Sequence, residues 1–226
     1  LQKSQGGLTS MTSKAYKVAC GYVLGLLDAN ADFVSGLDKA LLYCRQSFTN
    51  EDFTYFWDER VLLEEEKHLQ KWMSDLLSES RPPDDIVVLW FALVCEANFN
   101  LGYVIDLCFA GDSKEDIINE GVCGFEIPEY LPRRHLAHSP FLRELAKNID
   151  RLSFESRFLA EYILGMTYVA LAARDLSQCF AKELSRKTAT TIMAGFAAGE
   201  GVIVGRVCNG IFIPSSNNGN GETAER

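Results

Sequence analysis

The side chains best suited to chemistry are acids placed inside apolar stretches of the chain. Glu65 lies among apolar residues at helical spacing, and His68 follows one turn later, so the two form a Glu-x-x-His pair. Glu96 and Glu161 each interrupt a long apolar stretch, and Glu200 lies among glycines. Carboxylates and imidazoles that face the inside of a helical protein are ligands for metals such as iron and manganese.

One inward carboxylate on each of four expected helices resembles the carboxylate-bridged di-metal helix bundles. In that family the Glu-x-x-His pair occurs twice, whereas it occurs once here, since His135 and His138 lie in or beside a loop. The alternative is that these acids pair with Arg174, Arg206 or Lys182, or bond backbone groups, as buried charges must. We therefore predict no metal or other cofactor, and the five residues named above stay as candidate ligands.

A basic cluster lies in residues 121–139, which glycine and two prolines mark as a long irregular loop. Guanidinium and imidazole groups bind phosphate or carboxylate, so the cluster predicts a loop that binds an anion or a partner. The alternative is a solvated loop without a ligand. The cluster consists of Arg133, Arg134, His135 and His138, with Tyr130 beside them.

The sequence contains none of the common catalytic motifs, such as a phosphate-binding GxxxxGK[ST], a GxSxG elbow or an HExxH. Cys123, in the same loop as the basic cluster, would need His135 or His138 beside it to act as a nucleophile. These observations favour a protein without enzymatic activity.

Charge is distributed unevenly along the chain. Its net charge of −9 argues against nucleic acid as a partner, because nucleic-acid surfaces need a basic stripe. Residues 50–120 hold 17 acidic and 5 basic residues, a net charge of −12. This segment predicts a surface for a basic protein partner; the alternative is an ordinary solvated face. The predicted partner-binding residues are Glu59, Glu64, Glu65, Glu66 and Asp75.

Seven scattered cysteines without a CxxC pair indicate buried thiols in a reducing compartment. Residues 1–12 contain no apolar signal segment, and we expect them to be a disordered leader. Residues 214–226 are polar and of low complexity, which predicts a disordered tail. The expected location is the cytoplasm.

Apolar residues mostly recur at spacings of three and four, which predicts an all-α fold. We expect one domain, residues 13–213, built as a bundle of seven or eight helices. Residues 86–110 are apolar on every side for three turns, so they predict a central buried helix. Residues 192–213 carry five glycines, two GxxxG pairs among them, and predict a closely packed C-terminal helix.

Residues 158–173 and 192–213 form the outline of an apolar helical hairpin with a basic tip at Arg186 and Lys187. In outline it resembles the hairpin of colicin-like pore-forming domains, which implies that it inserts into a membrane. Three charges oppose insertion, each costing about 2.5–3.5 kcal/mol at the centre of a bilayer. These charges are Glu161, Glu200 and Arg206.

The preferred interpretation is a non-catalytic helical interaction protein, such as a regulator, an adaptor or an immunity-type protein, with an acidic surface for a basic partner. A membrane-inserting domain that uses residues 158–213 is the first alternative, with membrane association through residues 192–213. A helical metalloenzyme is the second.

Overall fold

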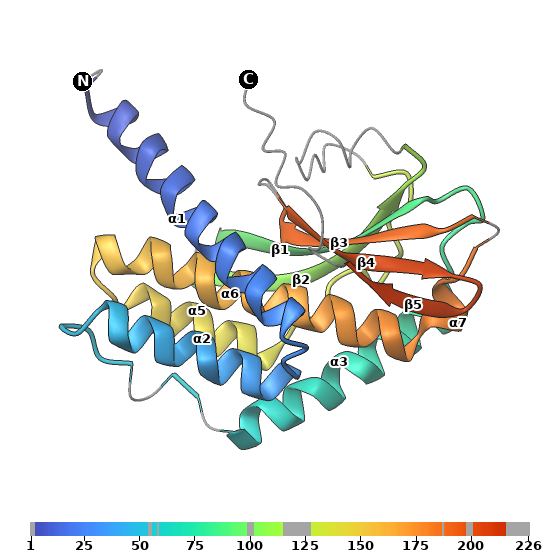
Figure 1. The fold of residues 1–226 in the computed structure, drawn as a ribbon, viewed down its shortest axis with the longest axis horizontal. Helices are drawn as coiled ribbons and strands as arrows, with labels where there is room; N and C mark the ends of the chain where they lie inside the picture. The colour runs from blue at the N-terminus through green and yellow to red at the C-terminus, as the bar shows by residue number, and fades with distance from the viewer. Residues whose placement is uncertain are drawn as a thin grey trace.

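The computed structural model describes residues 3–53, 56–57, 59–98, 102–114, 128–186, 188–197 and 201–215. In these residues the chain forms an α/β fold, in which helices pack against a mixed sheet of five strands (Figure 1). The prediction of an all-α bundle is therefore wrong, because two of the segments assigned to helices form the sheet.

Two of the helices begin at polar capping residues. Asp32 caps one helix by accepting a 2.8 Å hydrogen bond from the Ser35 N–H, and Ser139 caps another by accepting 2.9 Å from the Leu142 N–H. The helices are α1 (Lys3–Asp28), α2 (Phe33–Ser47), α3 (Glu59–Glu79), α5 (Pro140–Asp150), α6 (Phe154–Cys179) and α7 (Ala181–Leu184).

One helix begins inside a segment that was expected to be disordered. Helix α1 begins at Lys3, inside the stretch assigned to the leader. The tail from residue 216 onward lies outside the described residues.

The sheet has the strand order β2-β1-β3-β4-β5. Neighbouring strands are antiparallel except β1 and β3, which are parallel, with Val88 opposite Thr191. Its strands are β1 (Val88–Asn98), β2 (Gly102–Asp112), β3 (Thr190–Phe196), β4 (Gly201–Cys208) and β5 (Ile211–Pro214).

The expected central helix at residues 86–110 is the β1–β2 hairpin. Every residue from Val88 to Leu93 is at most 3% exposed. A strand buried on both faces is a continuous apolar run and lacks the alternation that marks a half-exposed strand. The same run therefore fits an all-apolar helix equally well, and its β-branched and aromatic residues decide for a strand.

The expected glycine-spaced helix at residues 192–213 is the β3–β4–β5 meander. Asn209 and Gly210 both have positive φ, 51° and 75°, and form the two-residue turn between β4 and β5. Positive φ at both turn positions is the reason that Asn-Gly favours tight hairpins. The helical hairpin required for membrane insertion is thus absent, and no described helix is long and apolar enough to span a bilayer.

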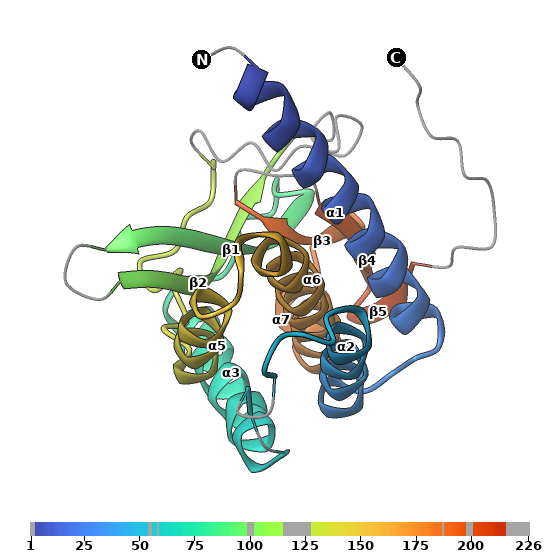
Figure 2. The same ribbon diagram turned by 90° about the vertical axis from the view of Figure 1, so that its left-hand side faces the viewer.

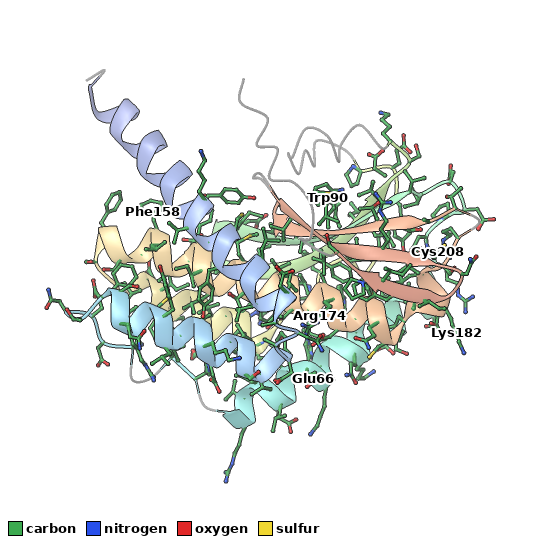
Figure 3. The ribbon with its side chains drawn as sticks, in the orientation of Figure 1. Glu66, Trp90, Phe158, Arg174, Lys182 and Cys208 are labelled. Atoms are coloured by element: carbon green, nitrogen blue, oxygen red, sulfur yellow. The ribbon has the colours of Figure 1, made fainter. Side chains whose placement is uncertain are left out.

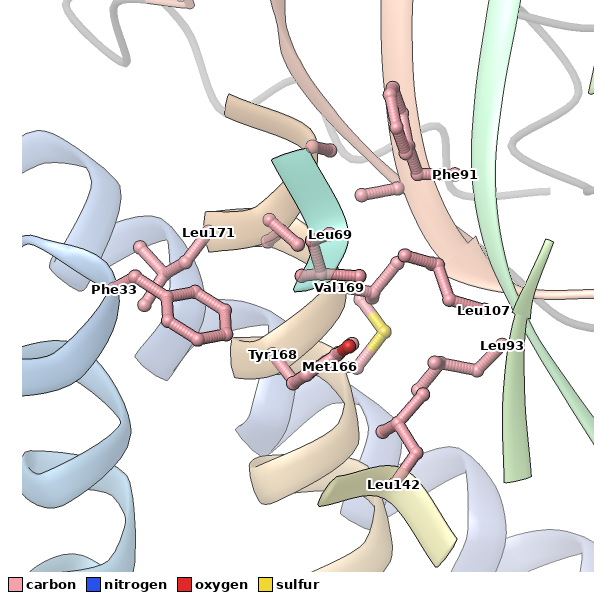
Figure 4. Close-up of a cluster of buried hydrophobic side chains, with 14 of the residues drawn as sticks. Phe33, Leu69, Phe91, Leu93, Leu107, Leu142, Met166, Tyr168, Val169 and Leu171 are labelled. Carbon is pink, nitrogen blue, oxygen red and sulfur yellow. The ribbon is translucent and has the colours of Figure 1, made fainter. Parts of the chain in front are cut away.

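Helix α6 forms the centre of the core. In Figure 2 it lies between the sheet and helices α2, α3 and α5. Residues 163–174 are all buried. Figure 4 shows α6 side chains reaching both ways, with Met166 and Val169 near the strand residues Leu93 and Leu107, and Leu171 near Phe33 of α2.

Glycines at GxxxG spacing play different parts in α1 and in β4. A Cβ added to Gly21 or Gly25 of α1 would meet nothing within 4 Å in the described structure, so this pair makes no close helix contact. A Cβ on Gly205 would lie 2.5 Å from the Ile213 carbonyl oxygen and 2.6 Å from the Phe212 ring. Gly205 therefore allows β5 to approach β4 closely.

We expect Gly205→Ala to destabilise the protein by about 1–3 kcal/mol, because the added methyl group must push β5 from β4. The matched change Gly21→Ala should stabilise it by up to about 1 kcal/mol, because alanine is the better helix former and has free space. Urea unfolding followed by circular dichroism measures both. Equal effects of the two substitutions would contradict this assignment.

Candidate functional site

Two adjoining hollows lie between α3 and residues 131–141. The larger has a volume of about 600 Å³ and the smaller about 290 Å³, and His68 lines both. We name the pair the α3 groove. The larger hollow is lined by His68, Lys71, Trp72, Asp75, Arg133, Arg134, His135, Leu136, Ala137 and His138. The smaller is lined by Arg60, Val61, Glu64, Glu65, His68, Pro140 and Phe141.

Residues 131–138 form the wall of the groove opposite α3. Two side chains of α3 hydrogen-bond to the backbone of this wall. The Trp72 indole N–H donates to the Arg134 carbonyl at 2.9 Å, and the His68 Nε2 lies 2.9 Å from the Ala137 carbonyl oxygen. Because a carbonyl only accepts, the His68 Nε2 carries the hydrogen.

The same segment is fastened to the edge of β2 on its other side. The Phe109 N–H donates to the His135 carbonyl, and the Ala137 N–H donates to the Leu107 carbonyl, each at 2.9 Å. The wall therefore covers the free edge of β2 and is held on both sides, so the groove exists without a ligand to shape it.

All three histidines of the chain line the larger hollow. His135 Nδ1 lies 3.0 Å from the Pro132 carbonyl oxygen, so it donates there. His138 has a positive φ of 50°, and its Nδ1 lies 3.6 Å from Asp106 Oδ2. The histidines thus hold the backbone and β2, and they do not converge on a shared point.

The rims of the groove carry charges of both signs. On α3, Lys71 pairs with Asp75 at 2.7 Å, and Glu64 pairs with Lys67 at 3.0 Å. Glu79, at the end of α3, pairs with Arg134 of the opposite wall at 3.2 Å. These pairs are exposed, and exposed pairs contribute only about 0–1 kcal/mol each, so a partner can replace them.

Glu65 lies beneath the smaller hollow and faces the core. It is 3% exposed, and its Oε1 accepts a 2.5 Å hydrogen bond from the hydroxyl of Tyr168, which is fully buried. Burial, followed by the nearby Glu65 carboxylate, raises the pKa of Tyr168 well above its usual value. Glu65 therefore anchors α3 to α6 and does not belong to an exposed acidic face.

The other predicted partner-binding acids do not share one surface. Glu64 and Asp75 line the groove. Glu66 follows Glu64 by two residues, about 200° around the helix, and so lies on the other flank of α3. Figure 3 labels Glu66 on this helix. The side chain of Glu59 lies outside the described residues. The basic cluster, in contrast, comes together: all four of its members line the larger hollow.

The candidate metal ligands are separated. Glu96 is exposed on β1, while Glu65 and His68 bond to Tyr168 and Ala137. Across the described residues no three His, Cys, Asp or Glu side chains gather closely enough for a metal ion. Glu200 and Cys123 lie outside the described residues.

Glu161 belongs to a separate half-buried cluster near the tip of the β1–β2 hairpin. It accepts a hydrogen bond from the Tyr103 hydroxyl, and the Arg157 guanidinium lies 4.9 Å from the centre of the Tyr103 ring. Burial raises the pKa of Glu161, and it raises the pKa of the neighbouring Cys95 to about 12. A thiol with so high a pKa is a poor nucleophile.

Comparisons with known protein families, with curated proteins and with solved structures find no match to this chain. The geometry of the α3 groove is therefore the basis for the functional argument. Sequence reasoning missed the role of Trp72 in it, because helical spacing predicts that Trp72 is buried but not which backbone group its indole meets.

We expect Tyr168→Phe to destabilise the protein by about 1–3 kcal/mol, because the buried Glu65 carboxylate loses its donor. Tyr43→Phe is the control, since the half-buried Tyr43 hydroxyl makes no hydrogen bond within the described structure. Urea unfolding of both variants tests this. If Tyr43→Phe lowers the free energy of unfolding as much as Tyr168→Phe does, the anchoring role of the Tyr168–Glu65 hydrogen bond is refuted.

Glu161 should make stability depend on pH. Its pKa is raised above 4.5 in the folded protein, so the folded state binds its proton more tightly than the unfolded state. The free energy of unfolding therefore falls as pH rises from about 4.5 through the raised pKa. Glu161→Gln removes this loss, so the variant should gain stability relative to the parent between pH 4.5 and pH 7. A difference that is constant across that range would contradict this.

Proposed function

We propose that this chain is a non-catalytic interaction protein that holds a segment of a partner protein in the α3 groove. One observation carries the proposal: two hollows join at His68, and their rims contain charged residues from two elements about 70 residues apart. A regulator or an adaptor would use such a groove to recognise its partner.

The groove has the dimensions of a short peptide. From Val61 to Asp75 it follows about four turns of α3, roughly 21 Å at 1.5 Å per residue. An extended segment of about six residues spans that length at 3.3 Å per residue. Val61, an apolar residue in the lining of the smaller hollow, is 40% exposed. Apolar contacts with a charged rim are the usual composition of protein interfaces.

The smaller hollow favours a basic residue of the partner. Its lining includes Glu64, whose carboxylate is exposed, and Glu65, which is buried and bonded to Tyr168. Glu64 is 75% exposed and engaged only by the exposed Lys67 among the described residues. A lysine or arginine of the partner can take the place of Lys67 at little cost. The acidic segment predicts a partner protein with a basic surface. We propose more specifically that one lysine or arginine of that partner binds at this end of the groove.

Three thiols, of buried Cys44 and Cys108 and half-buried Cys95, support the non-catalytic part of the proposal. Burial raises the pKa of Cys44, Cys95 and Cys108 to about 12 each. The thiolate is the reactive form of cysteine, so these three residues are structural.

The test uses a dye-labelled peptide of eight residues, with lysine at one end followed by alternating leucine and serine. We expect saturable binding by fluorescence anisotropy, and about fivefold weaker binding to Glu64→Lys, equivalent to about 1 kcal/mol. Glu144→Lys is the matched control, because Glu144 is 55% exposed and pairs with Lys147 three residues on, as Glu64 does with Lys67.

The control should bind the peptide as the parent does. Absence of saturable binding to the parent protein would refute the proposed groove, as would equal weakening by Glu64→Lys and Glu144→Lys. Circular dichroism of each variant shows whether the fold is kept.

A further inference from the structure

We propose that the larger hollow of the α3 groove receives an acidic side chain of the partner segment, and that Arg133 binds it. This inference rests on the proposed function and adds the chemistry of the second end of the segment. The inference is based on three observations: the charge of the hollow, the ion pairs of its cations and the hydrogen bonds that fix the backbone of its wall.

The larger hollow is a positive site on an acidic protein. Its lining includes three cations, Lys71, Arg133 and Arg134, and one carboxylate, Asp75. The chain as a whole carries a net charge of −9. An acidic group of a partner is repelled by most of this surface and attracted here, so charge favours this position.

Among the three cations, Arg133 is the one that can bind a carboxylate without breaking an ion pair within the described residues. Lys71 is held by Asp75 at 2.7 Å, and Arg134 is held by Glu79 at 3.2 Å. Arg133 is exposed and forms no ion pair with any described residue. A guanidinium group presents two parallel N–H donors to a carboxylate, which makes arginine the preferred partner for aspartate and glutamate.

The backbone on both sides of Arg133 is already fixed. The Pro132 carbonyl accepts from His135 Nδ1 at 3.0 Å, and the Arg134 carbonyl accepts from the Trp72 indole at 2.9 Å. Only the Arg133 side chain must therefore be ordered on binding, which lowers the entropic cost of association.

The residue beside the acid should be apolar. Trp72, Leu136 and Ala137 line the same hollow. Together with Glu64 at the other end of the groove, they fit a partner segment that has a basic residue at one end, apolar residues in the middle and an acidic residue at the other end. The two charged ends also set the direction in which the partner segment lies along the groove. In the reversed direction its basic end would meet Arg133 and its acidic end would meet Glu64.

The experiment compares two peptides that differ at one end. Both begin with lysine and continue with alternating leucine and serine, and one ends in glutamate where the other ends in serine. We expect the glutamate peptide to bind about tenfold more tightly to the parent protein. Arg133→Glu should abolish that tenfold difference and leave the serine peptide unaffected. Arg143→Glu, an exposed arginine of α5 outside the groove lining, should change neither.

The outcomes separate this inference from the proposed function. If both peptides bind the parent equally, the acidic site is refuted while the groove stands; if neither binds, the groove itself is refuted. Arg133→Glu should also bind a peptide that ends in lysine better than the parent does. If inorganic phosphate displaces the glutamate peptide more strongly than sodium chloride at equal ionic strength, the site takes free anions and the assignment to a protein carboxylate is wrong.

Discussion

The fold depends on the burial of α6, a helix with apolar side chains on every side. Residues 163–174 have no exposed face, so other elements of the chain must pack against every side of this part of the helix. The sheet covers one side, and α1, α2, α3 and α5 cover the others (Figure 2). Tyr168 is one of the buried polar side chains of this stretch, and its hydrogen bond to Glu65 joins α6 to α3. The groove therefore lies where it does because α3 is docked on a buried helix through a buried hydrogen bond.

Local chemistry made the capped helices predictable. Asp32 and the Ser139-Pro140 pair are residue types that favour helix starts, and in the structure both cap helices. The acidic helix and the basic cluster were also recognisable as separate features. Their meeting in one groove was not, because no periodic pattern relates α3 to a loop about 65 residues later. The contacts that join them, from His68 and Trp72 to backbone carbonyls, depend on tertiary structure alone.

The two segments that form the sheet were mispredicted for a physical reason. Burial on both faces removes the alternation of β1, and glycines in β4 imitate a helix-packing motif. One local signal did favour the strands: Asn209-Gly210 between two apolar runs is a strong hairpin signature. A glycine in a strand also permits close approach of a neighbouring chain, which is the role of Gly205.

The parallel pairing of β1 with β3 has a consequence for how the protein is made. Val88 meets Thr191 only after about 100 further residues have left the ribosome. Until then the apolar edge of β1 is unpaired, and such an edge is a template for pairing with other chains. Long-range strand pairing of this kind is slow, and the waiting intermediate is prone to aggregation. During synthesis, the edge of β1 in the nascent β1–β2 hairpin is therefore expected to need shielding from other chains until β3, β4 and β5 have been made.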